Sequence, residues 1–370
     1  PINLSQVPRL FKSRRLPIHV ALVQASPPDD FGWMSLGVSV DITQAAAYSA
    51  DMVIVQVNPR MPRVLGRSFI HVNDVDVIVE HEEGLLTIDE PPEMESANAI
   101  GRLIARLIDD GSTLQISLGT TSQATYVGLS DKNDLGIHTQ FVTDRIMHLV
   151  SQGVVTNRYK GLNEGKVVAS SAIGSAELYD FLDDNPGIEF YPSDYVNDPG
   201  IISQHRRMVS LNVAMAMDLT GQVAADALPY NHFSGITGLL DFMRGAAASE
   251  DGKAILGCWA IISEDPEAEL ARVGDHVLYQ ANEYIKWGAF GPPEEATLFP
   301  DAKTAIENGL YELWDADTAV SELSKLLDTY PNIRDVHFWA QFPGEPIDSG
   351  SSRMEYIATQ VLPRVREAIA

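Results

Sequence analysis

The amino-acid sequence predicts an α/β fold, in which open, mostly parallel sheets are flanked by helices and followed by a helix-rich α/β tail. Two observations predict this fold. Over the first part of the chain, apolar runs of strand length alternate with helical stretches, an order typical of parallel strands joined by crossover helices. From about residue 264 onward, long helical patterns dominate instead. Because the chain has 370 residues, more than one hydrophobic core is expected.

Three apolar runs near the N-terminus are predicted to be buried strands, at 18–23, 52–57 and 75–80. The turn-forming sequences Ser-Pro-Pro-Asp and Asn-Pro follow the first two runs. Helices are expected in the alanine-rich stretch 41–50 and in the amphipathic stretch 97–108. The acidic, proline-bearing segment between the third strand and the second helix is expected to be an exposed connection.

A further strand is predicted at 113–118, where it runs into a turn rich in Gly, Thr and Ser. Open parallel sheets bind their ligands beyond the carboxyl ends of the strands, so a site is expected in the loops at those ends. These loops are 26–37, 119–123, 138–144, 195–199 and 235–241.

The last third of the chain is predicted to be mainly helical. Asp301 and Asp315 each stand where they would cap the helix that follows. A strand containing aromatic residues is expected at 334–342. The predicted helices are 265–286, 301–314, 315–328 and 349–370.

The composition disfavours several classes of partner. The net charge is −25 and the sequence pI is about 4.6. Nucleic acid and anionic membrane surfaces are therefore not expected as partners, because both need clustered Lys and Arg. No apolar run reaches the ~18 residues that span a bilayer, and residues 1–10 lack the layout of a signal peptide. A cytoplasmic protein is expected.

Few residues could form a disulfide or hold a metal. Cys258 is the only cysteine, so a disulfide within the chain and a cysteine-rich metal site are excluded. Cys258 lies in an apolar, strand-like run and is expected to be an inert core thiol. The nine histidines show no metal-binding spacing, so no metal is predicted.

Several segments with chemistry-bearing residues occur in order along the first two thirds of the chain. They are 26–29, 58–63, 68–72, 195–199, 203–207, 218–223 and 235–246. Over about residues 1–255 this series closely resembles the acetyl-CoA hydrolase/transferase family, which includes 4-hydroxybutyrate and butyryl-CoA:acetate CoA-transferases. The resemblance implies a CoA-transferase-like fold, coenzyme A bound as an acyl-CoA substrate, and a short carboxylic acid as second substrate. It also implies a partial N-terminal domain, 1–110, and the start of a second domain, 111–255.

In that family a glutamate carboxylate attacks the acyl-CoA thioester, and coenzyme A then converts the resulting anhydride into a glutamyl thioester. The glutamate lies in a Gly-Ile-His-(Thr/Ser)-Glu stretch, which here spans 136–140 and ends in Gln140. A carboxamide carries no charge and is not a nucleophile. Three interpretations stay open: an acyl-CoA hydrolase in which Gln140 orients water, a catalytically inactive CoA-binding relative, and a transferase inactivated by a Glu-to-Gln change. Asp144 is a candidate base, because it would share a helix face with Gln140 if this stretch were helical.

The resemblance implies roles for two further residues of the catalytic site. Gly238 matches the position whose backbone N–H helps to hold the thioester oxygen. Asn197 matches an asparagine that contacts the acyl or carboxylate group. From the residues alone, each could equally be a turn former. His138 and His205 flank the inferred site and are expected to be structural.

Other positions are candidate contacts for coenzyme A. The stretch 115–122 matches the family's acyl-CoA loop, with Ser117 and Ser122 in place of a usual glycine and proline. Backbone amides in such a loop can cradle a ligand. Arg60 and Arg63 are candidates for the coenzyme phosphates, although an ordinary surface role suits each of them. The cofactor-binding candidates are Ser26, Gly119, Thr120, Thr121, Gly235 and Arg244.

The segment 256–370 instead resembles the C-terminal part of luciferase-like flavin-dependent monooxygenases. That family folds as a (β/α)₈ barrel, and a barrel needs all its strands, so the tail alone is not expected to bind flavin. A flavin- or deazaflavin-dependent oxidoreductase is kept as an alternative function. Missing strands would expose apolar faces, so a homo-oligomer is expected. The segments that carry this resemblance are 256–262, 275–280, 287–293, 335–345 and 353–358.

Overall fold

The computed structural model divides the chain into two compact units. The first comprises Pro1–Leu211 and Thr237–Ala254, and the second comprises Asn212–Ile236 and Ile255–Ala370. Both units combine helices with mostly parallel strands, which confirms the predicted α/β class. The structure describes residues 2–88, 95–213, 216–217, 223–224, 227–228, 231–232, 238–258, 260–286, 297–308, 311–329, 337–338, 342 and 344–368.

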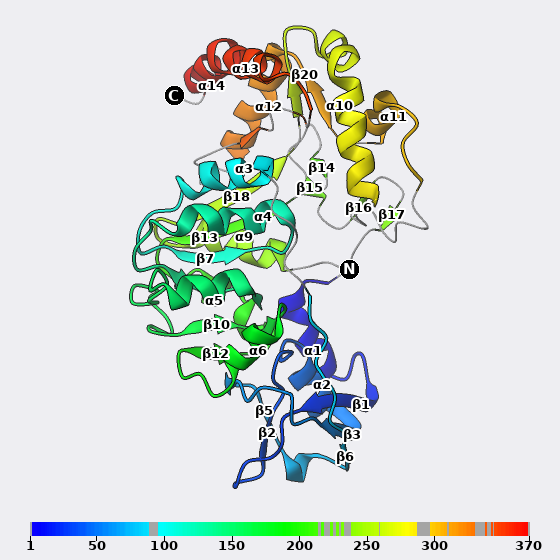
Figure 1. The fold of residues 1–370 in the computed structure, drawn as a ribbon, viewed down its shortest axis with the longest axis vertical. Helices are drawn as coiled ribbons and strands as arrows, with labels where there is room; N and C mark the ends of the chain where they lie inside the picture. Colours follow the sequence, from blue (N-terminus) through cyan, green and yellow to red (C-terminus); the bar gives the residue numbers. More distant parts are fainter. Residues whose placement is uncertain are drawn as a thin grey trace. The chain divides into compact units, whose positions relative to one another are not determined.

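The first unit begins with a parallel sheet in the order β1-β3-β6, formed by the three predicted strands. Its side chains alternate between two faces, as a strand period of two requires. Ala21 and Val23 of β1 and Val55 of β3 are buried on the face that carries α2 (Figure 1). The bounds are α1 (Val7–Lys12), β1 (Ile18–Ala25), α2 (Thr43–Ser49), β3 (Ala50–Val57) and β6 (Val77–Glu80).

A short antiparallel pair, β2 with β5, joins this sheet region to the rest of the unit. Next come β4, β10 and β12, which form a second parallel sheet, and β9 with β11, which form a parallel pair. The bounds are β2 (Trp33–Ser35), β4 (Leu65–Gly66), β5 (Phe69–His71), β9 (Phe141–Val142), β10 (Val167–Ala169), β11 (Ser171–Ala172) and β12 (Ile188–Phe190).

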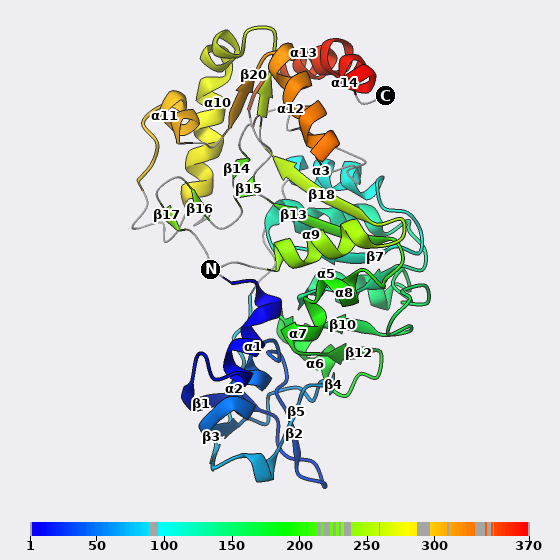
Figure 2. The same cartoon turned by 180° about the vertical axis from the view of Figure 1, so that it is seen from behind.

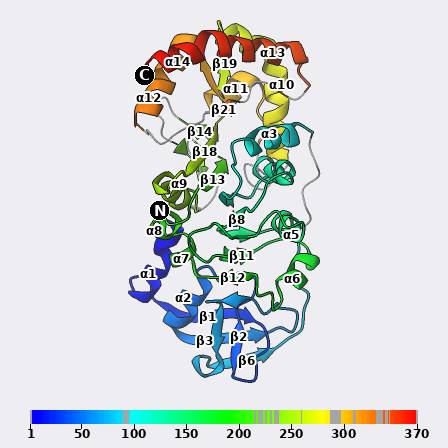
Figure 3. The same cartoon turned by 90° about the vertical axis from the view of Figure 1, so that its left-hand side faces the viewer.

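The strands that end at the predicted site are β7, β8 and β13. They are parallel, so their carboxyl ends meet at one edge. Figure 3 shows α5 and α6 on one side of β8, β11 and β12, with α7, α8 and α9 on the other. The strand bounds are β7 (Thr113–Ile116), β8 (Gly136–Ile137) and β13 (Met208–Val213). The helix bounds are α3 (Glu95–Ala105), α4 (Thr120–Ala124), α5 (Asp144–Ser151), α6 (Ala176–Leu182), α7 (Ser193–Val196), α8 (Pro199–Ile202) and α9 (Leu239–Ala248).

The second unit has a parallel pair, β19 with β20, covered by helices on both faces (Figure 2). Consecutive residues of β19 point to opposite faces. Ile261 packs into a core with α10 and α11, whereas Ile262 packs with α12 and α14. The bounds are β19 (Ala260–Ile262), α10 (Pro266–Lys286), α11 (Ala302–Glu307), β20 (Glu312–Trp314), α12 (Ala316–Thr329), α13 (Ile347–Tyr356) and α14 (Leu362–Ala368).

The remaining elements are short. They are the 3₁₀ turns Leu4–Gln6, Val72–Asp74 and Thr125–Leu129, the π turn Ile357–Val361, and the strands β14 (Ala216–Met217), β15 (Val223–Ala224), β16 (Ala227–Leu228), β17 (Asn231–His232), β18 (Lys253–Cys258) and β21 (His337–Phe338). The strand β18 continues from the first unit into the second and contains Cys258, as predicted.

One predicted helix is wrong. The stretch 301–314 is not one helix, because α11 ends at Glu307 and Glu312–Trp314 pairs with β19 instead. The bulky Tyr311 and Trp314 side chains are buried in two different cores, Tyr311 with α10 and α11 and Trp314 with α12 and α14. A strand between these two layers of helices allows side chains to enter both cores. The predicted caps are present, since Thr304 N donates to Asp301 Oδ1 and Thr318 N donates to Asp315 Oδ1. Of the predicted strand 334–342, the structure describes a strand only at His337–Phe338.

Candidate active site

Gln140 follows the short strand β8 at its carboxyl end. The backbone of His138 extends the parallel pairing, because its N–H donates to Leu114 O and it bridges Val168. The Gln140 carbonyl accepts hydrogen bonds from Ser170 and Ser171 N–H groups. These backbone bonds fix the Gln140 main chain, and its side chain stays half-buried.

The three predicted catalytic positions lie together in the first unit. Asn197 ends α7, and Gly238 stands at the N-terminus of α9. A Cβ atom built on Gly238 would lie 2.3 Å from Asn197 Nδ2 and 2.8 Å from Gln140 Oε1. Three segments far apart in the sequence therefore bring two carboxamides against one glycine. A Cβ atom there would force at least one of the two carboxamides to move.

The Asn197 carboxamide is buried and unpaired. The residue is 0% exposed, and neither Nδ2 nor Oδ1 has a hydrogen-bond partner among the residues that the structure describes. Buried polar atoms nearly always have partners, so an orphaned carboxamide marks a place where a polar ligand atom fits. The first turn of α9, whose N-cap is Gly238, adjoins it. Helix N-termini offer N–H groups that suit oxygen atoms bearing negative charge.

A buried basic cluster supports the loop that carries Gln140. His138 Nε2 lies 2.8 Å from Val196 O, and a carbonyl can only accept, so the ring donates this bond. The His205 ring lies 4.3 Å from the His138 ring, centroid to centroid, and donates from Nδ1 to Lys160 O. The Lys160 ammonium donates to Ile137 O at 2.7 Å. The His138 bond thus joins the Gln140 segment to the Asn197 segment.

Burial disfavours the charged form of each member of this cluster. Burial lowers the pKa of Lys160 to about 7 and that of His205 to about 3. Burial, together with the nearby His205 and Lys160, lowers the pKa of His138 well below its usual range. Both imidazoles are therefore neutral at physiological pH, which fits the expected structural role for them. Nothing in the sequence around Lys160 marked it as buried.

Two carboxylates that lie close to Gln140 and Gly238 along the sequence accept hydrogen bonds from serines of other segments. Asp144 does not share a helix face with Gln140, because Gln140 precedes a strand and α5 begins only at Asp144. The Asp144 carboxylate accepts from Ser175 N at 3.1 Å. Asp241 Oδ2 accepts from Ser5 N at 3.1 Å, and burial raises the pKa of Asp241. The helical expectation that made Asp144 a candidate base is wrong.

The predicted acyl-CoA loop lies at the carboxyl end of β7. Gly119 has φ +124°, a conformation that L side chains rarely adopt, and Thr120 and Thr121 begin α4. Ser117 Oγ and Ser122 Oγ lie 3.0 Å apart, so the two serines that replace the usual residues bind each other. Contact of this loop with coenzyme A stays a prediction.

The other predicted coenzyme contacts are placed as follows. Ser26 is buried, and its Oγ accepts from Ser35 N at 2.9 Å. Arg60 pairs with Glu82, and Arg63 pairs with Asp29 and Asp184. Arg244 is exposed on α9. Gly235 lies outside the described residues. Their predicted roles remain predictions.

The part of the chain that the structure describes contains no cluster of three or more His, Cys, Asp or Glu side chains that could hold a metal ion. None of the described helices is both long and apolar enough to cross a membrane.

Two family models match the chain. The model of the acetyl-CoA hydrolase/transferase N-terminal domain matches residues 1–89, and that of the C-terminal domain matches residues 174–277. The chain belongs to the acetyl-CoA hydrolase/transferase family. The resemblance drawn from the ordered motifs is therefore confirmed at the level of the family.

Known family members extend this finding. The chain is 44% identical over 273 residues to 4-hydroxybutyrate coenzyme A transferase of Clostridium kluyveri, covering 74% of this chain and 63% of that enzyme. It resembles the crystal structure of 4-hydroxybutyrate CoA-transferase from Porphyromonas gingivalis, with 39% identity, a TM-score of 0.63, and coverage of 69% of this chain and 62% of that one. It resembles RipA from Yersinia pestis with 39% identity and a TM-score of 0.66, covering 70% of this chain and 58% of that one. The chain thus spans less than two thirds of the length of each of these proteins.

The predicted resemblance of the tail to luciferase-like monooxygenases is not supported. The family match continues beyond residue 255 to residue 277, well into α10. The apolar strand and helix in that stretch belong to the family's own C-terminal domain. The boundaries predicted at 110 and 255 remain predictions for the domains of the chain.

Proposed function

We propose that the first unit binds an acyl-coenzyme A thioester at Gln140, Asn197 and Gly238, and that it lacks the carboxylate needed to form an acyl-enzyme. The observation that carries this proposal is the convergence of two carboxamides on Gly238. The unpaired amide of Asn197 supports a polar ligand there. Within a family that handles acyl-CoA, a thioester is the group that such donors would hold.

The chemistry of the three residues suits recognition better than covalent transfer. Asn197 Nδ2 is a donor beside Gly238 at the N-terminus of α9, and fixed donors stabilise an oxygen on which negative charge develops. Gln140 can donate or accept a hydrogen bond but cannot attack a carbonyl carbon. Asp144 and Asp241 are held by Ser175 and Ser5, so neither is free to replace the missing carboxylate.

The ligands are proposed from the relatives. Proteins similar to this chain are named 4-hydroxybutyrate coenzyme A transferase and butyryl-CoA:acetate CoA-transferase. We therefore propose a short-chain acyl-CoA, with a short carboxylate as the group that would accept coenzyme A.

The test is the variant Gln140→Glu. Calorimetric titration of the unmodified chain with butyryl-CoA should show binding, while incubation with butyryl-CoA and acetate should give neither acetyl-CoA nor free thiol. Gln140→Glu should form acetyl-CoA from the same mixture, because it places a carboxylate beside Gly238. Gln140→Asp is the matched control, since it has the charge but is one methylene shorter and should stay inactive.

Two outcomes would contradict the proposal. Free thiol released by the unmodified chain without acetate would mean that Gln140 supports hydrolysis by water. Absence of butyryl-CoA binding, together with inactivity of Gln140→Glu, would mean that this cluster is not an acyl-CoA site.

A further inference from the structure

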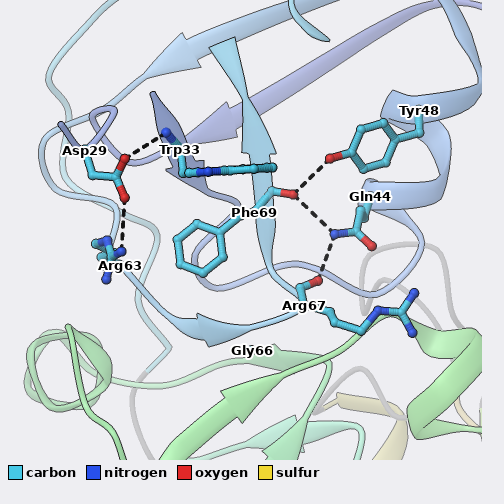
Figure 4. Close-up of a pocket in the computed structure, with 8 residues that line it drawn as sticks. All are labelled: Asp29, Trp33, Gln44, Tyr48, Arg63, Gly66, Arg67 and Phe69. Carbon is cyan, nitrogen blue, oxygen red and sulfur yellow. Dashed lines mark hydrogen bonds and ion pairs between the residues drawn. The ribbon is translucent and has the colours of Figure 1, made fainter. Parts of the chain in front are cut away.

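A second hollow in the first unit lies apart from the described site residues, among β2, α2 and β5 (Figure 4). It has a volume of about 420 Å³, within the range of small-molecule sites. None of Gln140, Asn197 and Gly238 lines this hollow, whereas Arg63, a candidate contact for the coenzyme phosphates, does.

The walls of this hollow are fixed by hydrogen bonds among the lining residues. Asp29 accepts from Trp33 N at 2.9 Å and from Arg63 Nη2 at 3.2 Å. Gln44 Nε2 donates to Arg67 O at 2.8 Å, and Tyr48 Oη donates to Phe69 O at 3.3 Å. Figure 4 shows these bonds in two groups, one around Asp29 and the other around Gln44 and Tyr48. A site built this way loses little conformational freedom when a ligand binds.

Two aromatic side chains of the lining are unusually exposed. Trp33 is 42% exposed and Tyr48 is 51% exposed. Large aromatic surfaces gain from burial and from stacking on another ring. The two exposed rings therefore offer a place for a flat, aromatic ligand.

The charges of the hollow leave one cation unpaired. The Asp29 carboxylate is paired with Arg63, and Arg63 is also paired with Asp184. The Arg67 guanidinium has no hydrogen bond or ion pair to any residue that the structure describes, although its backbone is held. In a chain of net charge −25, an unpaired arginine beside exposed rings is a local site for an anion.

We infer that this hollow binds a planar aromatic ring that carries an anionic group, with the ring against Trp33 and Tyr48 and the anion on Arg67. Two kinds of compound share this chemistry: an aromatic carboxylate and a nucleotide. Stacking and the charge-assisted bond are both required, so neither a neutral ring nor a charged aliphatic acid should bind comparably.

The inference is tested by equilibrium titration of the full chain with 2-naphthoate and, separately, with AMP. 2-Naphthol supplies the same ring without a charge at neutral pH. Arg67→Gln and Trp33→Leu should each weaken binding of the charged probe ~10-fold, the size expected for one charge-assisted bond or one stacked ring. Arg15→Gln is the control, because Arg15 is an exposed arginine of the same unit outside the hollow.

Each outcome decides the inference. Binding of 2-naphthoate alone assigns the site to aromatic carboxylates, and binding of AMP assigns it to nucleotides. Failure of both probes to bind overturns the inference. Equal binding of 2-naphthol, or binding unaffected by Arg67→Gln, also overturns it, because the hollow would then hold any apolar ring. Trp33→Tyr is a further control, because it keeps an aromatic ring. It should retain binding if Trp33→Leu weakens binding by removing the stacked ring, and not by unfolding the chain. Because coenzyme A also contains a phosphorylated adenosine, AMP binding counts for this hollow only where Arg67→Gln and Trp33→Leu weaken it.

Discussion

At the scale of single residues, Asn197 differs from the buried carboxylates close to it in the pairing of its side-chain atoms. Asn197 is completely buried, yet both atoms of its amide lack partners among the described residues. The nearby Asp144 and Asp241 are also buried, but serines hold them. The Asp144 and Asp241 carboxylates are therefore used within the fold, whereas the Asn197 amide atoms are available to a ligand.

Gly238→Ala should damage this site without damaging the fold. The Gly238 backbone has φ −74°, which any residue adopts, so the penalty is only steric. The added methyl group would collide with Asn197 Nδ2 and Gln140 Oε1 and should weaken butyryl-CoA binding by at least ~10-fold, which corresponds to about 1.4 kcal/mol. Gly84→Ala is the control, because no atom lies within 4 Å of its Cβ position. Equal affinities of the two variants would contradict the proposed position of the thioester.

Lys160 gives the chain a stability that depends on pH. Its pKa is about 7 in the folded protein, against 10.5 for an ordinary lysine. Between these pH values the unfolded chain holds a proton that the folded chain does not, so the unfolding free energy rises with pH. Relative to Lys160→Met, the unmodified chain should gain about 1 kcal/mol per pH unit from pH 7.5 to 9.5. Urea unfolding at several pH values measures this slope, and parallel curves for the two proteins would contradict a buried, neutral Lys160.

At the scale of elements, the site depends on short strands that end together. Only Gly136 and Ile137 form β8, so the next residues leave the sheet and present Gln140 at its carboxyl edge. The Asn197 segment arrives from α7, and the two segments are joined by the bond between His138 and Val196. Neither helix propensity nor strand propensity predicts such a bond, since it links residues 58 positions apart.

His138→Ala should therefore destabilise the first unit. The change leaves Val196 O without its donor and opens a cavity beside His205 and Phe242. The expected loss is about 2–4 kcal/mol of unfolding free energy, measured by urea unfolding. His148→Ala removes an exposed imidazole from α5 and should cost less than about 0.5 kcal/mol. Similar losses of unfolding free energy for both variants would show that the hydrogen bond from His138 to Val196 does not stabilise the first unit.

At the scale of the whole molecule, one face of the β1-β3-β6 sheet is left exposed by the residues that the structure describes. Leu22 is 76% exposed, and Val20, Met52 and Val77 on the same face are 42–49% exposed. Parallel sheets are normally covered on both faces. The homo-oligomer expected from the sequence remains a prediction, and this face is the surface on which it would form.

Light scattering during size-exclusion chromatography tests this association. The mass should rise with concentration for the unmodified chain, and Leu22→Lys should reduce the rise by placing a charge in the apolar face. Leu86→Lys is the matched control, because Leu86 is 93% exposed outside the sheet. A mass that stays that of a monomer at every concentration would contradict the prediction.

The sequence by itself determined the α/β class, most of the strands and helices, the family and the position of Gln140. These features depend on local periodicity and on ordered motifs, which a linear chain displays directly. The family resemblance placed Gln140, Asn197 and Gly238 in one site, and the tertiary structure gave the distances among them. Tertiary structure alone decided that Lys160 is buried, that the Asp144 carboxylate accepts hydrogen bonds from Ser175, and that Glu312–Trp314 is a strand rather than part of a helix. Each of these features depends on contacts between residues that are distant in the sequence. A local sequence pattern cannot predict the energies of such contacts.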